Sequence, residues 1–154
     1  MIPSVHAEVQ QIDHVFKLAD VLPKEEEILS HWARYLCVLV AGLIETGAQL
    51  VLSEYARIHA STETASFVVK QMRYQTNLNA NKLKQLLGAF SDQWADDFDR
   101  SLTDDEKDAI DSILANRHNI AHGRPVGISL VRVKDYYIRV TQVLEKLSAR
   151  VLGM

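Results

Sequence analysis

Residues 25–58, EEEILSHWARYLCVLVAGLIETGAQLVLSEYARI, carry the longest helical pattern in the chain. Three glutamates open the stretch, where acidic side chains suit the positive end of a helix dipole. Apolar side chains then recur at helical spacing, at Ile28, Trp32, Leu36, Leu39, Leu43, Leu50 and Val51. This spacing predicts one helix of about nine turns. A helix of this length is typical of the central helix of a bundle.

Shorter helical patterns flank this stretch. Residues 5–19 repeat apolar positions every three to four residues and stop near Pro23. Ser61 or Thr62 can cap a helix that runs to Met72. Asn77 or Asn79 can open another helix, which carries the apolar positions Leu83, Leu86, Leu87 and Phe90 and extends toward Trp94.

The C-terminal third holds the clearest start and stop signals. Thr103 and Glu106 form a capping box, and Gly123 and Pro125 end the helix at His122. A last helix is expected over residues 133–152, with Tyr136, Val140, Leu144, Leu147 and Val151 facing inward. The sequence therefore predicts an all-α fold, an antiparallel bundle of five to six helices around one long helix, in a single domain over residues 1–154.

The composition agrees with this class and excludes others. With 6 glycines and 3 prolines in 154 residues, the chain has too few turn residues for a β-sandwich or barrel. Its single cysteine, Cys37, excludes a disulfide framework and a cysteine-rich zinc site, and its apolar neighbours predict a buried thiol. The N-terminus lacks the pattern of a secretion signal, and the apolar run of residues 35–44 is shorter than a membrane span. We therefore expect a cytoplasmic protein without a membrane contact.

The net charge of −3 is a sum of opposed segments. Residues 92–111 hold nine acidic and two basic side chains, whereas residues 117–150 hold seven basic and two acidic ones. Residues 57–84 add five basic side chains against Glu63 alone. A polyanion could find a positive surface on this acidic chain.

Residues 104–122 contain an arginine in an unexpected position. On a helical wheel, Arg117 falls at the centre of the apolar stripe, where leucine is typical. Such an arginine must snorkel, pair with a buried carboxylate or face a second copy of the chain. His118 and His122 lie next to each other at the margin of the stripe, and the wheel sets Arg117 and His122 about 140° apart.

The stretch NRHNIAHG, residues 116–123, resembles the Arg-x4-6-His signature of the HEPN superfamily of all-α domains. The resemblance implies a bundle of four to five helices. It also implies a metal-independent endoribonuclease that acts as a symmetric dimer, without a cofactor, with the two motifs meeting at the interface. Two copies would bring Arg117 and His122 together despite their separation on one helix.

The resemblance also assigns roles to individual residues. Arg117 would stabilise the phosphate and His122 would act as acid and base, with His118 at the polar position after the arginine and Asn119 as a neighbour. Many relatives carry a glutamate in the long helix, and two residues match it. Glu45 lies off the apolar stripe, whereas Glu54 lies on it and could pair with Arg117.

Other functions remain open at this stage. His118 and His122 have the spacing of two metal ligands on one helix face, but the glutamate of His-Glu-x-x-His is absent. A non-catalytic module that binds RNA, nucleotides or a protein is the main alternative. The family includes toxins and phage-defence effectors, so the expected partners are an RNA substrate, a second copy of the chain and a cognate antitoxin or inhibitor.

Overall fold

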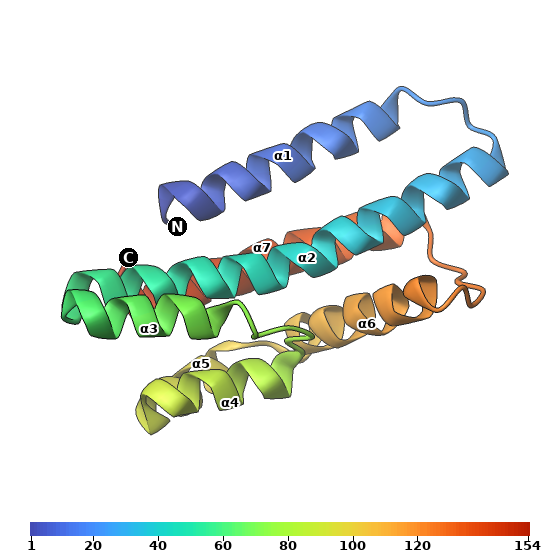
Figure 1. Ribbon diagram of the computed structural model, residues 1–154. Helices are drawn as coiled ribbons and strands as arrows, with labels where there is room; N and C mark the ends of the chain where they lie inside the picture. Colours follow the sequence, from blue (N-terminus) through green and yellow to red (C-terminus); the bar gives the residue numbers. More distant parts are fainter.

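The computed structural model describes residues 1–154 and consists of seven helices without a strand, which confirms the all-α prediction (Figure 1). The helices are α1 (Pro3–Asp20), α2 (Glu26–His59), α3 (Thr62–Met72), α4 (Ala80–Phe90), α5 (Asp92–Ser101), α6 (Asp104–Ala121) and α7 (Leu130–Leu152). The seventh helix arises because the predicted fourth helix is two helices. Ser91 has extended backbone and ends α4, and its Oγ accepts a hydrogen bond from the Trp94 N–H at the start of α5.

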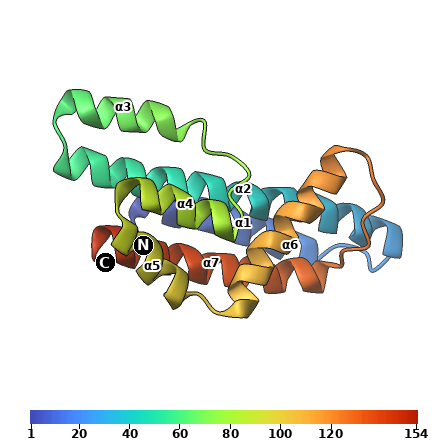
Figure 2. The same cartoon turned by 90° about the horizontal axis from the view of Figure 1, so that it is seen from below.

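The long helix α2 is central, as predicted. Helices α1, α3, α6 and α7 all pack on it, and Figure 2 shows α2 between α3 and α7. Helix α7 approaches α2 closely at Gly47, where a Cβ atom would stand 2.6 Å from Leu144 Cδ2. A side chain at position 47 would therefore displace a core leucine.

Helix α2 is longer and more apolar than the ten-residue run of residues 35–44 indicates. By length and composition alone it could cross a membrane, so the shortness of that run does not by itself exclude a span. However, 61% of its most apolar window is buried by the rest of the protein, as in the core helix of a bundle.

The last helix begins at Leu130, three residues earlier than predicted, because the Ser129 Oγ caps it by accepting from the Arg132 N–H. Its register also differs at one position. Tyr137 is buried, and its hydroxyl donates to Asp13 Oδ1 at 2.6 Å, while Tyr136, predicted to face inward, is only partly buried. The polar hydroxyl is buried because α1 supplies this acceptor.

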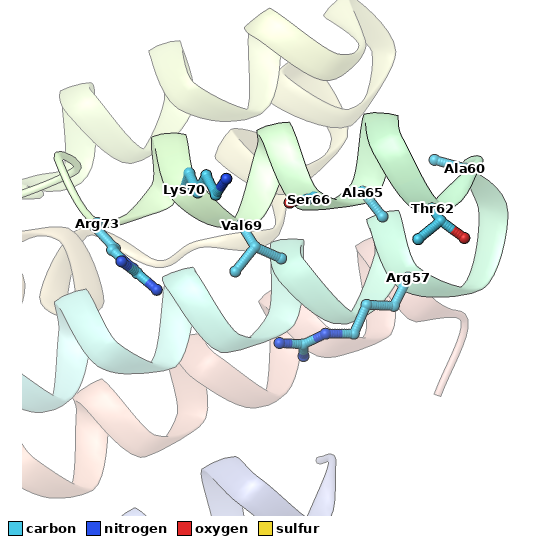
Figure 3. A pocket seen from close by; sticks show the side chains of 8 residues that line it. All are labelled: Arg57, Ala60, Thr62, Ala65, Ser66, Val69, Lys70 and Arg73. Carbon is cyan, nitrogen blue, oxygen red and sulfur yellow. The ribbon is translucent and has the colours of Figure 1, made fainter.

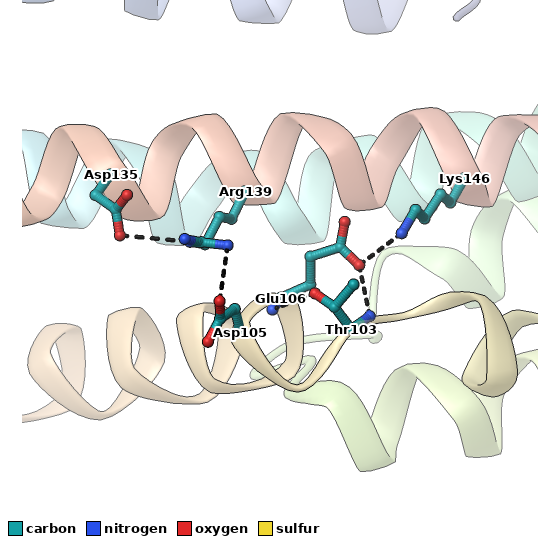
Figure 4. A network of polar contacts seen from close by, with 6 residues as sticks. All are labelled: Thr103, Asp105, Glu106, Asp135, Arg139 and Lys146. Atoms are coloured by element: carbon teal, nitrogen blue, oxygen red, sulfur yellow. Dashed lines mark hydrogen bonds and ion pairs between the residues drawn. The ribbon is translucent and has the colours of Figure 1, made fainter.

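The capping box of α6 is present and also ties α6 to α7 (Figure 4). The Thr103 N–H donates to Glu106 Oε2 at 2.8 Å, and Lys146 Nζ donates to the same oxygen at 2.7 Å. The Glu106 residue is only 4% exposed. Burial raises the pKa of the Glu106 carboxyl, but the hydrogen bonds from Lys146 and Thr103 outweigh it and hold this pKa below its usual value.

The Glu106–Lys146 contact makes stability depend on pH. Glu106→Gln keeps the capping box, because glutamine also serves at this position, and removes the charge. We expect a loss of about 1–2 kcal/mol in unfolding free energy at neutral pH. Since the folded pKa is lowered, the stabilisation is complete above the unfolded pKa of about 4.3 and disappears as the pH falls through the folded pKa. Urea denaturation at neutral and acidic pH should show the difference from wild type shrinking in acid.

Asp105→Asn is the control. The Asp105 carboxylate is 73% exposed and 3.5 Å from Arg139, so its loss should cost less than about 0.5 kcal/mol. A loss in Glu106→Gln that stays constant from neutral to acidic pH would contradict this account.

Candidate functional site

Arg117, near the end of α6, pairs with a carboxylate of α2. Its Nη1 donates to Glu45 Oε1 at 2.9 Å, and the two side chains are 21% and 15% exposed. Of the three environments that the sequence left open for this arginine, the structure therefore has the pairing with a carboxylate. The alternative partner, Glu54, lies 3.7 Å from Arg57 instead, in a pair that is largely exposed.

A third residue, Asn77, completes this group of side chains. Arg117 Nη2 donates to Asn77 Oδ1, and the Asn77 N–H donates to Glu45 Oε1 at 2.7 Å. Asn77 has a φ of 53°, a left-handed conformation that asparagine tolerates better than most residues. We call Glu45, Asn77 and Arg117 the arginine cluster.

Asn77 is the residue that sequence reasoning missed, because it was considered only as a helix cap. The cap of α4 is Asn79, whose Oδ1 accepts from the Lys82 N–H at 2.8 Å. The sequence held one signal for this role of Asn77: a second asparagine, Asn79, stands two residues later. Asn79 can start the helix, which leaves Asn77 free to adopt a turn.

One further hydrogen bond holds the loop that carries Asn77, residues 73–79, and another holds the first residue of α4 directly after it. Gln49 of α2 donates from Nε2 to the Gln75 carbonyl at 3.0 Å. Asp111 of α6 accepts at Oδ1 from the Ala80 N–H at 3.0 Å. The segment is thus attached to both helices that position Arg117. The arginine cluster is therefore preformed and does not depend on a ligand.

His118 and His122 form a second group at the C-terminal end of α6. Their ring centroids are 4.4 Å apart, and both side chains are exposed. His122 caps the helix, with its N–H donating to the His118 carbonyl, and Gly123 follows with a φ of 65°. The chain can therefore leave the helix directly behind His122.

Asn119 forms its hydrogen bonds with Arg124, in the turn that follows α6, and not with the histidine pair. Its Oδ1 accepts from Arg124 Nη1 at 3.3 Å, and its carbonyl accepts from the Arg124 N–H at 2.9 Å. Asn119 therefore stabilises the turn after α6. No hydrogen bond joins either histidine ring to the arginine cluster of the same chain, and no third side chain of metal-ligand type joins the pair.

The chemistry available to Arg117 follows from its remaining donors. A guanidinium has five N–H groups, and two are used by Glu45 and Asn77, so others can reach a phosphate oxygen. Glu45 fixes the orientation of the fork while neutralising part of its charge.

Cys37 lies close to this region without taking part in it. The thiol is buried and its Sγ lies 3.7 Å from the Ile113 carbonyl. Burial raises the pKa of the Cys37 thiol to about 12, an effect that the nearby Arg117 charge only partly offsets. The thiolate needed for nucleophilic attack is therefore scarce at neutral pH.

Comparison with known proteins identifies one family. The family described as RiboL-PSP-HEPN matches the chain over residues 6–151. No curated protein and no solved structure matches it. The match leaves out only the first three residues of α1 and the last residue of α7, so it concerns the whole bundle.

The two glutamates of α2 provide a matched test of the arginine cluster. Glu45→Ala leaves a largely buried guanidinium and the Asn77 N–H without their acceptor, so we expect a loss of about 2–3 kcal/mol in unfolding free energy. Glu54→Ala removes only an exposed pair and should change the value by less than about 0.5 kcal/mol. Thermal and urea denaturation measure both. Equal effects of the two substitutions would show that the ion pair does not hold the loop.

Proposed function

Because this chain belongs to the RiboL-PSP-HEPN family, we propose that it is a metal-independent endoribonuclease. The arginine cluster carries the proposal. An arginine that is partly buried, oriented by a carboxylate and an amide, and left with free N–H groups is suited to a phosphate. Family membership favours an RNA-related function, and the exposed histidine pair adds the acid–base groups that cleavage requires.

In the proposed reaction, His122 accepts the proton of a ribose 2′-OH, and the 2′ oxygen attacks the adjacent phosphorus. Arg117 donates hydrogen bonds to the phosphoryl oxygens as charge develops on them. The bond from phosphorus to the 5′ oxygen breaks, and the departing oxygen takes up a proton from a protonated histidine. The products are a 2′,3′-cyclic phosphate and a 5′-OH. DNA lacks the attacking hydroxyl and should not be cut.

His118 and Glu45 have supporting roles in this proposal. The His118 ring packs against the His122 ring and can restrict its orientation. Glu45 acts through Arg117, so it is a positioning residue. The proposal gives Asn119 a structural role in the turn after α6, because its Oδ1 accepts from Arg124.

The proposed active site is composite. Within one chain no hydrogen bond joins the histidine pair to the arginine cluster, and on a helical wheel Arg117 and His122 are about 140° apart. A two-fold dimer in which the α6 helices face each other would place His122 of one copy beside Arg117 of the other. The proposed setting is the cytoplasm of a bacterial cell, where the enzyme would act as a toxin or phage-defence effector under a cognate antitoxin.

Cleavage without metal is the direct test. In EDTA, the wild-type protein should cut single-stranded RNA and leave 2′,3′-cyclic phosphate ends, while Arg117→Ala and His122→Ala should lower the rate by a factor of about 100 or more. His14→Ala, which removes an exposed histidine of α1, should leave the rate unchanged. Gel analysis and mass spectrometry of the products measure this.

Full activity of His122→Ala would contradict the assignment of His122 as the acid–base group. Loss of activity in EDTA with recovery in Zn²⁺ would favour a metal site at the two histidines. RNA binding without any cleavage by the wild-type protein would favour the non-catalytic module.

Mixing the two inactive variants tests the composite site. A mixed dimer of Arg117→Ala and His122→Ala retains one site with both groups intact, so random mixing should restore roughly a quarter of wild-type activity. Light scattering should give twice the 17.4 kDa mass of the chain. A monomeric mass, or no recovery on mixing, would contradict a site shared between two copies.

A further inference from the structure

A groove with three cationic side chains runs between the end of α2 and α3 (Figure 3). It has a volume of about 410 Å³. Its lining residues are Arg57, Ala60, Thr62, Ala65, Ser66, Val69, Lys70 and Arg73. Figure 3 shows Arg73 at the end of α3 where the loop toward α4 begins, and Ala60 and Thr62 at the opposite end.

The cations of this groove are largely uncompensated. Lys70 and Arg73 take part in no ion pair, and Arg57 has only the exposed contact of 3.7 Å with Glu54. Within residues 57–84 the only acidic side chain is Glu63, in the first turn of α3. The groove is therefore a local positive surface on an acidic protein, and a polyanion complements it.

Two exposed aromatic side chains directly follow groove residues in the chain: Phe67 follows Ser66, and Tyr74 follows Arg73. Phe67 is 63% exposed and Tyr74 is 78% exposed. Tyr74 lies in the turn just after α3 ends at Met72, whereas Phe67 and Lys70 are three residues apart on α3 and are therefore neighbours on one side of its surface. Helix α3 packs only on α2, so this side is uncovered. Exposed aromatic rings beside cations are the elements with which proteins hold unpaired bases and their phosphates.

We propose that this surface binds single-stranded RNA. Arg57, Lys70 and Arg73 contact phosphates along the groove, and Phe67 and Tyr74 stack on bases. The groove ends at Arg73, only four residues before Asn77, so a strand that leaves it is directed toward the arginine cluster. Delivery of substrate rests on the proposed endoribonuclease function, whereas binding does not.

A matched pair of triple variants tests the phosphate contacts. The groove variant is Arg57→Gln, Lys70→Gln, Arg73→Gln, and the control is Lys17→Gln, Lys24→Gln, Lys134→Gln. Both lose three positive charges from exposed lysine or arginine positions, so they differ only in where the charge is removed. The probe is a fluorescent 2′-O-methyl 20-mer without secondary structure, which cannot be cleaved through a 2′-OH.

We expect the groove variant to bind this probe about 10- to 100-fold more weakly than wild type, and the slope of log affinity against log salt to fall by about 2. The control variant should change affinity by less than threefold. Phe67→Ala and Tyr74→Ala should each weaken binding about tenfold without changing the salt slope, because stacking involves no counterions. A duplex of the same sequence should be insensitive to the two aromatic substitutions.

Parallel cleavage assays separate this inference from the proposed function. If wild type cleaves RNA, the groove variant should show a raised KM and an unchanged kcat. If wild type does not cleave but the groove variant alone loses affinity, the binding surface stands and the nuclease proposal fails. Equal affinities of the groove and control variants overturn the surface. Loss in the groove variant with no effect of either aromatic substitution would keep the phosphate contacts and overturn the stacking of bases on Phe67 and Tyr74.

Discussion

The burial of α2 is the constraint from which the rest of the structure follows. Four helices pack on it, so the polar side chains that they bury must find partners within the protein. Glu45 is 15% exposed and meets this requirement by pairing with Arg117 and the Asn77 backbone. One ion pair thus joins the central helix, the helix that carries the histidines and the loop between α3 and α4. The geometry of the candidate site therefore follows from the ion pair and hydrogen bond that the partly buried Glu45 requires.

The same constraint explains what could be predicted from the sequence. Helix starts with a side-chain cap, such as Thr103 and Ser61, were visible because capping is local. The sequence did not show which of Glu45 and Glu54 pairs with Arg117. The helical wheel assumes one apolar stripe, whereas other helices cover α2 on several sides. Ser91 was missed although its cap is also local: its Oγ accepts from the Trp94 N–H, and the apolar positions on both sides of it were taken as one continuous helix. Asn77 needed the tertiary position of its loop.

The acidic and basic segments of the chain pair with each other in the fold, which a count of charges along the sequence does not show. The acidic run of residues 92–111 meets the basic side chains of α7, in the pairs Asp97–Arg150, Glu106–Lys146 and Asp105–Arg139. Together with Arg117, which pairs with Glu45, these cations are four of the seven in residues 117–150, and each pairs with a carboxylate of the same molecule. The C-terminal segment is therefore less positive than its charge count indicates. The cations of residues 57–73 have no such acidic run opposite them. The surface available to a polyanion therefore lies on α2 and α3, far along the chain from the histidine motif.

The loop of residues 73–79 connects these two regions physically. It begins at the last cation of the groove and holds Asn77 in a left-handed turn between Glu45 and Arg117. Its anchors on α2 and α6 fix the donors of Arg117 without help from a substrate, and fixed donors are more effective than ones that must reorganise as charge develops. A strand bound along α3 would meet phosphate donors that are already oriented. The histidine pair differs from the arginine cluster, because both rings are exposed and no hydrogen bond within the chain holds them. In the proposed dimer, the second copy would complete the site.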